Sequence, residues 1–165
     1  MRQARRSAKK PASHTARPLT KLVANRSDLL ERHVNRIQKL ITLSEDGAIL
    51  IGIDFGRRMH ESQRRITAKM LTLAYLLGKA CAKELGLAKH EGSTLTELKG
   101  VVAGVLESIE DDELMRYTGQ LIRDGLVGCS ERGIYVINYL RLSEILDLLE
   151  GIAGESREVL REPQG

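Results

Sequence analysis

The sequence predicts a mainly helical protein with a small β component, an α+β fold. Apolar residues keep helical spacing from Glu61 to Leu85, two shorter helical stretches follow, and two short segments within 125–138 alternate like paired strands. The chain has 165 residues, of which 42% are hydrophobic and 29% charged. A chain of this length and composition can bury one core of ordinary size. We therefore expect one folded unit.

The composition also argues against several classes of protein. No apolar run approaches the roughly 20 residues that span a bilayer, and the N-terminus has no apolar signal-peptide core, so we expect a cytoplasmic protein without membrane contact. Cys81 and Cys129 belong to no CxxC or Cys/His cluster and are expected to be buried free thiols. The scattered histidines form no metal-ligand spacing, and no phosphate loop or nucleophile motif occurs. We expect no enzyme activity, no cofactor and no metal.

Positive charge is concentrated at the N-terminus. Residues 1–26 hold eight Lys or Arg and no acidic residue, whereas the other 139 residues hold 18 basic and 22 acidic side chains, a net charge of −4. Residues 1–25 also lack apolar periodicity, so we expect a disordered basic arm. Such an arm on a mildly acidic body predicts contact with nucleic acid. The arm residues expected to make it are Arg2, Arg5, Arg6, Lys9, Lys10 and Arg17.

Residues 26–60 are predicted to form a helix-strand extension. Ser27 and Asp28 offer a helix N-cap, and the apolar residues that follow keep three- and four-residue spacing, which predicts a helix over about 28–42. SEDG at 44–47 is typical of a turn. The alternation in AILIGIDF predicts a strand over 48–55.

The longest helix is predicted over 61–85, with Gly86 as its stop. Its apolar set is Ile66, Met70, Leu73, Leu77, Cys81 and Leu85. A second helix begins after Thr94, a credible N-cap with Glu97 as its capping-box partner, and ends at a break marked by Gly104.

A third helix is predicted from near Ser108 to Gly125. The segments GLVGCS and GIYVIN then read as two strands joined by the turn SERG. A final amphipathic helix is expected to end near Gly151, before a polar, frayed tail over 152–165. Its apolar set is Leu142, Ile145, Leu146, Leu148 and Leu149.

The segments LTLAYLLGKACAKELGL, TLTELKGVVAG, DELMRYTGQLIRDGLV and ERGIYVIN resemble the winged helix-turn-helix domains of many small archaeal proteins, over roughly 70–138. The resemblance implies a three-helix core with a β-hairpin wing over 61–151, and it implies nucleic-acid binding, often in transcriptional control. Winged helices also dock proteins, so the fold alone leaves both functions open.

Three groups of side chains in this region are candidates for nucleic-acid contact, because Arg, Lys and Gln supply the donors that phosphates and base edges accept. A basic cluster precedes and opens the long helix, a polar face lies on the third helix, and one arginine lies in the hairpin turn. These residues are Arg57, Arg58, Arg64, Arg65 and Lys69, then Arg116, Tyr117, Gln120 and Arg123, then Arg132.

Six carboxylates between Glu107 and Asp124 oppose that interpretation, because they outnumber the two arginines of the third helix by four charges. Carboxylates at a helix N-terminus occupy the place that a phosphate would take. They either stabilise the helix start or bind a basic protein partner. The residues concerned are Glu110, Asp111, Asp112 and Glu113.

We therefore expect a nucleic-acid-binding protein, a transcriptional regulator or chromatin-associated protein whose affinity comes mainly from the arm. One Phe, four Tyr and no Trp argue against a base-stacking surface, which favours DNA over RNA. The alternative is a protein-interaction or assembly module, such as a ribosome-associated or RNA-binding factor that uses the acidic helix. A helix over 61–85 would be about 37 Å long, enough to serve a homodimer as well.

Overall fold

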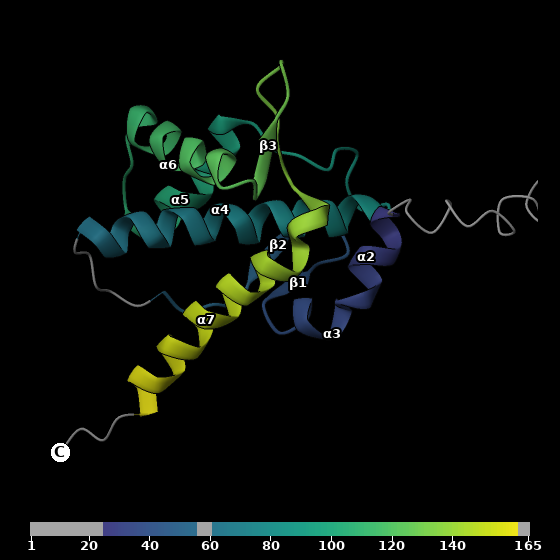
Figure 1. The fold of residues 1–165 in the computed structure, drawn as a ribbon, viewed down its shortest axis with the longest axis horizontal. Helices are drawn as coiled ribbons and strands as arrows, with labels where there is room; N and C mark the ends of the chain where they lie inside the picture. Colours follow the sequence, from purple (N-terminus) through teal and green to yellow (C-terminus); the bar gives the residue numbers. More distant parts are fainter. Residues whose placement is uncertain (1–24, 56–60, 162–165) are drawn as a thin grey trace, which may run out of the picture.

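Helix α4 (Glu61–Glu84) is the spine of the molecule, and the other elements pack on two sides of it (Figure 1). The computed structural model describes residues 25–55 and 61–161. On one side of α4 lie helices α5 (Leu95–Leu106) and α6 (Asp111–Arg123) and the hairpin of β3 (Val127–Cys129) and β4 (Tyr135–Ile137).

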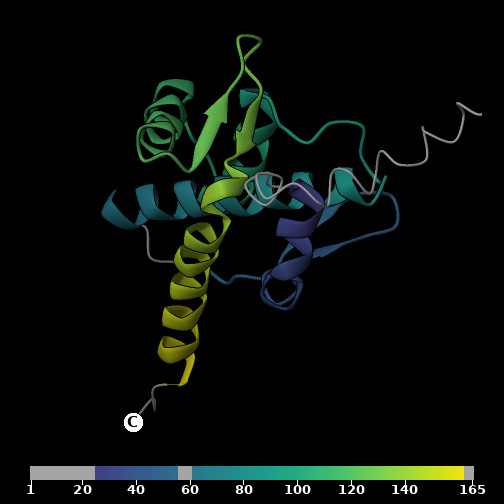
Figure 2. The ribbon, with the colours of Figure 1, turned by 45° about the vertical axis from the view of Figure 1, so that its right-hand side comes forward.

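Figure 2 shows the second layer on the opposite side of α4. It contains helices α2 (Arg26–Arg32), α3 (Val34–Ile37) and α7 (Leu142–Arg161) and the hairpin of β1 (Ile41–Leu43) and β2 (Ile49–Ile51). A short 3-10 helix (Tyr139–Arg141) joins β4 to α7. The mainly helical α+β class is confirmed. The predictions for the arm over 1–24 lie outside the described residues.

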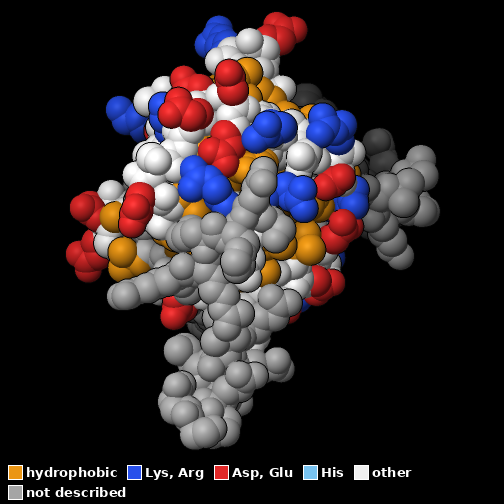
Figure 3. Space-filling model, turned by 90° about the vertical axis from the view of Figure 1, so that its left-hand side faces the viewer, with side chains coloured by type: hydrophobic (Ala, Val, Ile, Leu, Met, Phe, Trp, Pro, Cys, Tyr) orange, Lys and Arg blue, Asp and Glu red, His pale blue; other side chains and the backbone are white. Residues whose placement is uncertain are grey.

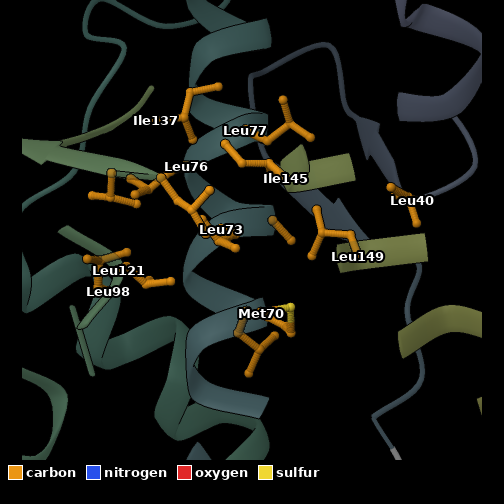
Figure 4. Close-up of a cluster of buried hydrophobic side chains, with 14 of the residues drawn as sticks. Leu40, Met70, Leu73, Leu76, Leu77, Leu98, Leu121, Ile137, Ile145 and Leu149 are labelled. Atoms are coloured by element: carbon orange, nitrogen blue, oxygen red, sulfur yellow. The ribbon is translucent and has the colours of Figure 1, made fainter. Parts of the chain in front are cut away.

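The core surrounds α4 because this helix is covered from both sides. Figure 4 shows its leucines packed between Leu98 and Leu121 on one side and Ile145 and Leu149 on the other. The apolar set predicted for this helix is therefore partly wrong, since Ile66 and Leu85 are 40% and 67% exposed. A helix between two layers buries a wider face than one stripe. The added buried apolar positions are Ala68, Leu71, Ala74, Leu76, Ala80 and Ala82.

The predicted helix over 28–42 is wrong beyond residue 37. Helix α2 is capped by Asn25, whose side-chain oxygen accepts a hydrogen bond from the Ser27 amide at 2.9 Å, and it breaks at His33. Residues 41–43 then pair with 49–51 as an antiparallel hairpin, and the strand expected over 48–55 is shortened to 49–51. Ile41 fits a helical and an alternating pattern equally well, so its burial in the hairpin is a tertiary outcome.

Buried Leu30, Ile37 and Ile41 pack this extension into the core, and two further contacts bring it close to α4 and α7. Gly78 lets β2 approach α4 closely, because a Cβ atom there would lie 2.5 Å from Ile49 Cγ2. Arg36 ties α3 to α7 through Glu150, with 2.8 Å from Nε to Oε2, and through Asp147, with 2.6 Å from Nη2 to Oδ1. The Arg36 guanidinium lowers the pKa of Glu150.

Helix α5 begins as predicted, because Thr94 Oγ1 accepts a hydrogen bond from the Glu97 amide at 3.2 Å. The predicted break at Gly104 is wrong, since α5 continues to Leu106 and ends at Glu107, which adopts a φ of 72°. A glycine inside a helix costs about 1 kcal/mol, which packing can overcome. Buried Val102 and Leu106 supply that packing on either side of it.

Helix α6 begins at Asp111 rather than at Ser108, and it ends at Arg123, two residues before Gly125, the predicted stop, which has a φ of 77°. The amides of Gly125 and Leu126 bond back to Ile122 and Leu121, which closes the helix and directs the chain into β3. The predicted hairpin of β3 and β4 is confirmed. Ser93 adds a bridge to Tyr135 of β4.

Helix α7 does not end at Gly151 but continues to Arg161, so the boundary predicted for the tail is wrong. Ile152 and Ala153 pack against the core, and this packing carries the helix through the glycine. Among the apolar positions predicted for α7, Leu148 is 39% exposed, whereas the other four are buried.

Candidate nucleic-acid interface

The orientation of α6 follows from its apolar spacing. Leu114, Tyr117, Thr118 and Leu121 are buried, and they repeat every three or four residues along one face. The opposite face is left to solvent. Arg116 and Arg123 lie on this exposed part of the helix.

The basic side chains of α4 lie beside α6. Lys69 Nζ donates a hydrogen bond to Gln120 Oε1 at 3.3 Å, and Arg65 lies one helical turn before Lys69 on the same side of α4. The structure thus brings residues of two separate predicted groups, Arg65 and Lys69 with Arg116, Gln120 and Arg123, onto one surface. We call these five residues the α4–α6 face.

Figure 3 looks onto the end of the molecule where α4 begins and shows Lys and Arg side chains gathered there among Asp and Glu side chains. Among the described residues, Arg65, Arg116 and Arg123 form no ion pair. These three cations are therefore free to meet an anionic partner.

Arg64 serves a different purpose from its neighbours. Its Nε lies 2.8 Å from Glu113 Oε2 and its Nη2 lies 3.1 Å from Glu113 Oε1, and Nη2 also donates to the Ser108 carbonyl. Both side chains of the pair are less than a quarter exposed. The guanidinium lowers the pKa of Glu113. Arg64 therefore fastens α6 to α4 and is engaged within the protein.

Tyr117 was predicted to share the exposed polar face of α6, but it is only 4% exposed. Its hydroxyl donates to Glu113 Oε2 at 2.8 Å, and burial raises its pKa. Its ring also lies under the Arg116 guanidinium, with 5.6 Å from the ring centroid to Cζ. Tyr117 is thus a buried residue that contacts Glu113 through its hydroxyl and Arg116 through its ring.

The acidic first turn of α6 is partly neutralised by neighbouring helices. Asp111 forms an ion pair with Lys99 of α5 at 2.8 Å, and Glu113 pairs with Arg64 as described. Glu110 is the N-cap residue, but its side chain makes no capping hydrogen bond. The net charge of −4 read from the sequence therefore overstates the negative charge that α6 presents to a partner.

Two apolar side chains are exposed on α6, and neither was predicted to belong to a binding surface. Met115 is 53% exposed and Ile122 is 39% exposed. They are seven residues apart and therefore share one side of the helix. The signal was available in the spacing, because both fall outside the buried stripe that contains Leu114 and Leu121.

The remaining candidates lie away from this surface or outside the described residues. Arg132 is exposed in the turn between β3 and β4, where the Gly133 amide donates to the Ser130 carbonyl. Arg57, Arg58 and the arm residues, predicted to bind nucleic acid, belong to the parts of the chain that are not described. These arm residues are Arg2, Arg5, Arg6, Lys9, Lys10 and Arg17.

A second polar cluster joins the start of α2 to the base of the β3–β4 hairpin. Arg26 Nη1 lies 2.6 Å from Glu91 Oε2, and its guanidinium stacks over the Tyr139 ring at 4.9 Å from the centroid. Tyr139 donates its hydroxyl to Glu91 at 2.8 Å. Sequence reasoning missed this cluster because its members are far apart in the chain. It holds the start of α2 against the end of the β3–β4 hairpin.

Neither cysteine behaves as a fully buried thiol. Cys81 is half-buried, and burial raises its pKa to about 11, whereas Cys129 is exposed on β3.

Within residues 25–55 and 61–161, no group of three or more His, Cys, Asp or Glu could hold a metal ion. No described helix is both long and apolar enough to span a membrane. No protein-family model, curated protein or solved structure matches the chain.

Proposed function

We propose that residues 61–151 form a winged helix-turn-helix domain that binds duplex DNA, in transcriptional control or in chromatin. In this proposal α5 and α6 are the helix pair, with α6 as the helix that enters the major groove, and the β3–β4 hairpin is the wing. The order of α4, the Ser93 bridge, α5, α6 and the hairpin supports this assignment.

The observation that carries the proposal is the α4–α6 face. Arg116 and Arg123 project from α6 without ion-pair partners among the described residues, and Arg65 and Lys69 lie beside them on α4. Cations next to a groove-binding helix can pair with the phosphates that flank the groove, whereas Arg and Gln on the helix can donate hydrogen bonds to base edges. Because Arg64 and Lys99 hold Glu113 and Asp111, the nearby carboxylates oppose phosphate less than their number suggests.

The basic arm would add affinity without sequence preference. Residues 1–24 contain seven Lys or Arg and no acidic residue. Each phosphate that such an arm neutralises on duplex DNA makes the slope of log affinity against log salt more negative by about 0.9. The arm and the α4–α6 face therefore have separable roles, the first in salt-dependent attraction and the second in orientation.

A fluorescence-anisotropy salt titration on duplex DNA tests both roles. Deletion of residues 1–24 leaves Asn25, the α2 N-cap, and Arg26 in place, and it should lower the salt slope by up to about 6. Replacement of Arg116 and Arg123 by alanine should weaken binding in the full chain, whereas Arg32→Ala, at an exposed arginine on α2, should not. Binding that is undetectable or independent of salt would contradict the proposal.

The alternative function, docking of a basic protein partner, receives narrower support. Of the four carboxylates assigned to it, Asp111 and Glu113 are held by Lys99 and Arg64. Glu110 and Asp112 form no ion pair with another described residue. Replacement of Asp112 by lysine distinguishes the two functions, because it should strengthen DNA binding but abolish capture of a basic partner.

A further inference from the structure

Helices α2 and α3 and strand β1 form a pocket against the C-terminal end of α4 (Figure 1). The pocket has a volume of about 620 Å³, and small-molecule sites typically have volumes of roughly 300–1,000 Å³ and mostly apolar walls. The apolar lining includes the buried side chains of Leu30, Ile37 and Ile41 and the exposed side chains of Val34 and Leu85. The N-terminal extension therefore packs on α4 without filling the space beside its last turn.

The pocket carries negative charge. Among the described residues that line it, the charged ones are Glu31 of α2 and Glu84 of α4, which come from opposite walls. Neither carboxylate forms an ion pair with another described residue. An apolar pocket with two unneutralised carboxylates is complementary to a ligand that is both apolar and positively charged.

The basic residues next to these carboxylates in sequence do not face the pocket. Arg32 is two positions after the lining residue Leu30, and Lys83 is two positions after the lining residue Cys81. A separation of two residues corresponds to about 200° around a helix, so both cations lie on the far side of their helices. The charge of the lining is therefore not cancelled by its neighbours in sequence.

The position of Glu84 strengthens this negative potential. Helix α4 has 24 residues and ends at Glu84, and the C-terminus of a helix carries a partial negative charge. A carboxylate there opposes the helix dipole, whereas a bound cation would interact favourably with the carboxylate and the dipole together. Burial, and after it the charge of Glu84, raises the pKa of Cys81, which also lines the pocket. The charge of Glu84 therefore reaches the pocket wall.

We propose that this pocket binds a small organic cation with an apolar body, of the class of aromatic or aliphatic amines. The apolar body would lie against Leu30, Ile37 and Ile41, and the ammonium group would pair with Glu31 and Glu84. Nucleotides, phosphates and fatty acids are negatively charged and would be repelled, whereas a bare metal ion would leave the apolar walls in contact with water. The pocket lies in the layer opposite α6, so this inference does not depend on DNA binding.

The test uses tryptamine, in which an apolar indole ring carries an ammonium group on a two-carbon chain. Tryptophol has a hydroxyl in place of the ammonium group, and indole-3-propionate has a carboxylate there. The chain contains no Trp, so indole emission can be recorded from the ligand alone, and its anisotropy measures binding to the full chain. We expect tryptamine to bind with a Kd of about 1 mM or lower. It should bind about fivefold more tightly than tryptophol, since both carboxylates are exposed, and indole-3-propionate should bind most weakly.

Two double variants identify the groups that select the cation. Glu31→Gln/Glu84→Gln removes both charges from the pocket and should bind tryptamine and tryptophol equally. The matched control Asp124→Asn/Glu131→Gln removes two exposed carboxylates from the layer on the other side of α4 and should keep the preference for tryptamine.

The thiol of Cys81 locates the bound ligand, because Cys81 lines the pocket. The chain has two cysteines, so Cys129→Ser leaves Cys81 as its single thiol. Saturating tryptamine should slow the alkylation of Cys81 by N-ethylmaleimide in this variant.

Several results would overturn the proposal. Equal binding of tryptamine and tryptophol to the wild type would show that the pocket does not select a cation. A preference that survives in Glu31→Gln/Glu84→Gln, or alkylation of Cys81 that tryptamine does not slow, would place the ligand elsewhere. Absence of saturable binding would remove the site. Binding that appears only after deletion of residues 1–24 would assign the pocket to the basic arm, and a dimer in sedimentation that Leu85→Asp dissolves, without tryptamine binding, would assign it to a second copy.

Discussion

The ion pair between Arg64 and Glu113 should be worth more than an ordinary surface pair, because it joins α4 to the helix proposed to enter the groove. Arg64→Met removes the guanidinium but keeps much of the apolar stem. Glu113→Gln keeps an oxygen that can still accept from the Tyr117 hydroxyl. The two variants and their combination form a double-mutant cycle.

The expected magnitude follows from geometry and exposure. Two N–H···O contacts of 2.8 and 3.1 Å join side chains that are 24% and 19% exposed. Exposed pairs contribute about 0–1 kcal/mol, whereas removal of one partner from a buried pair costs about 3–5 kcal/mol. Arg64→Met should therefore lower the free energy of unfolding by about 2 kcal/mol, and the coupling energy from the cycle should be about 1–2 kcal/mol.

Urea unfolding of the wild type and the three variants measures this coupling. The matched control is the pair of Arg141 and Glu144, whose side chains are 40% and 49% exposed and which should couple by less than about 0.5 kcal/mol. A coupling for Arg64 and Glu113 no larger than that of the control would refute the reasoning, since it would show that the pair does not fasten α6 to α4.

Three further predictions concern two helical glycines, the pH dependence of the Arg64–Glu113 pair and the charge of α6. Gly78→Ala should lower the free energy of unfolding by about 1–2 kcal/mol, because its new methyl group overlaps Ile49. Gly104→Ala should raise the free energy of unfolding by about 1 kcal/mol, because the position is open and alanine favours the helix. Equal effects of the two variants in urea unfolding would contradict this. The pKa of Glu113 lies below its ordinary value of 4.5, so the stability that its ion pair contributes is full above that pH and is lost as pH falls through the folded pKa. The wild type should therefore lose its advantage in melting temperature over Glu113→Gln below about pH 4.5. A difference in melting temperature that stays constant with pH would contradict this. Asp112→Asn removes an exposed negative charge from α6 and should raise affinity for duplex DNA about threefold at low salt, an effect that anisotropy should show fading as salt is added.

Elements with strong local signals were predictable. The long periodic run up to Gly86, the Thr94 cap and the glycine stop at Gly125 placed α4, the start of α5 and the end of α6. Each depends on interactions within a few residues, so no knowledge of the rest of the fold is needed. The hairpin after Gly125 was predictable for the same reason, because its alternation and turn are local.

Boundaries inside the N-terminal extension were not predictable, because apolar residues there fit more than one pattern. Ile41 continued the helical spacing of the residues before it, yet it pairs with Ile51. The glycines in α5 and α7 caused the opposite error, because they led us to predict helix ends too early in the chain. Gly104 and Gly151 resemble helix ends, but packing on either side keeps both helices intact.

The candidate site divides in the same way. The sequence alone determined the mainly helical class, the asymmetry between a basic N-terminus and a mildly acidic body, and most of the polar residues that could meet nucleic acid. Tertiary structure alone decided which act together: Lys69 donates a hydrogen bond to Gln120, Arg64 is engaged by Glu113, and Tyr117 is buried. The physical reason is that charge and helical spacing are properties of the chain, whereas neutralisation and exposure depend on neighbours brought together by the packing of α6 on α4.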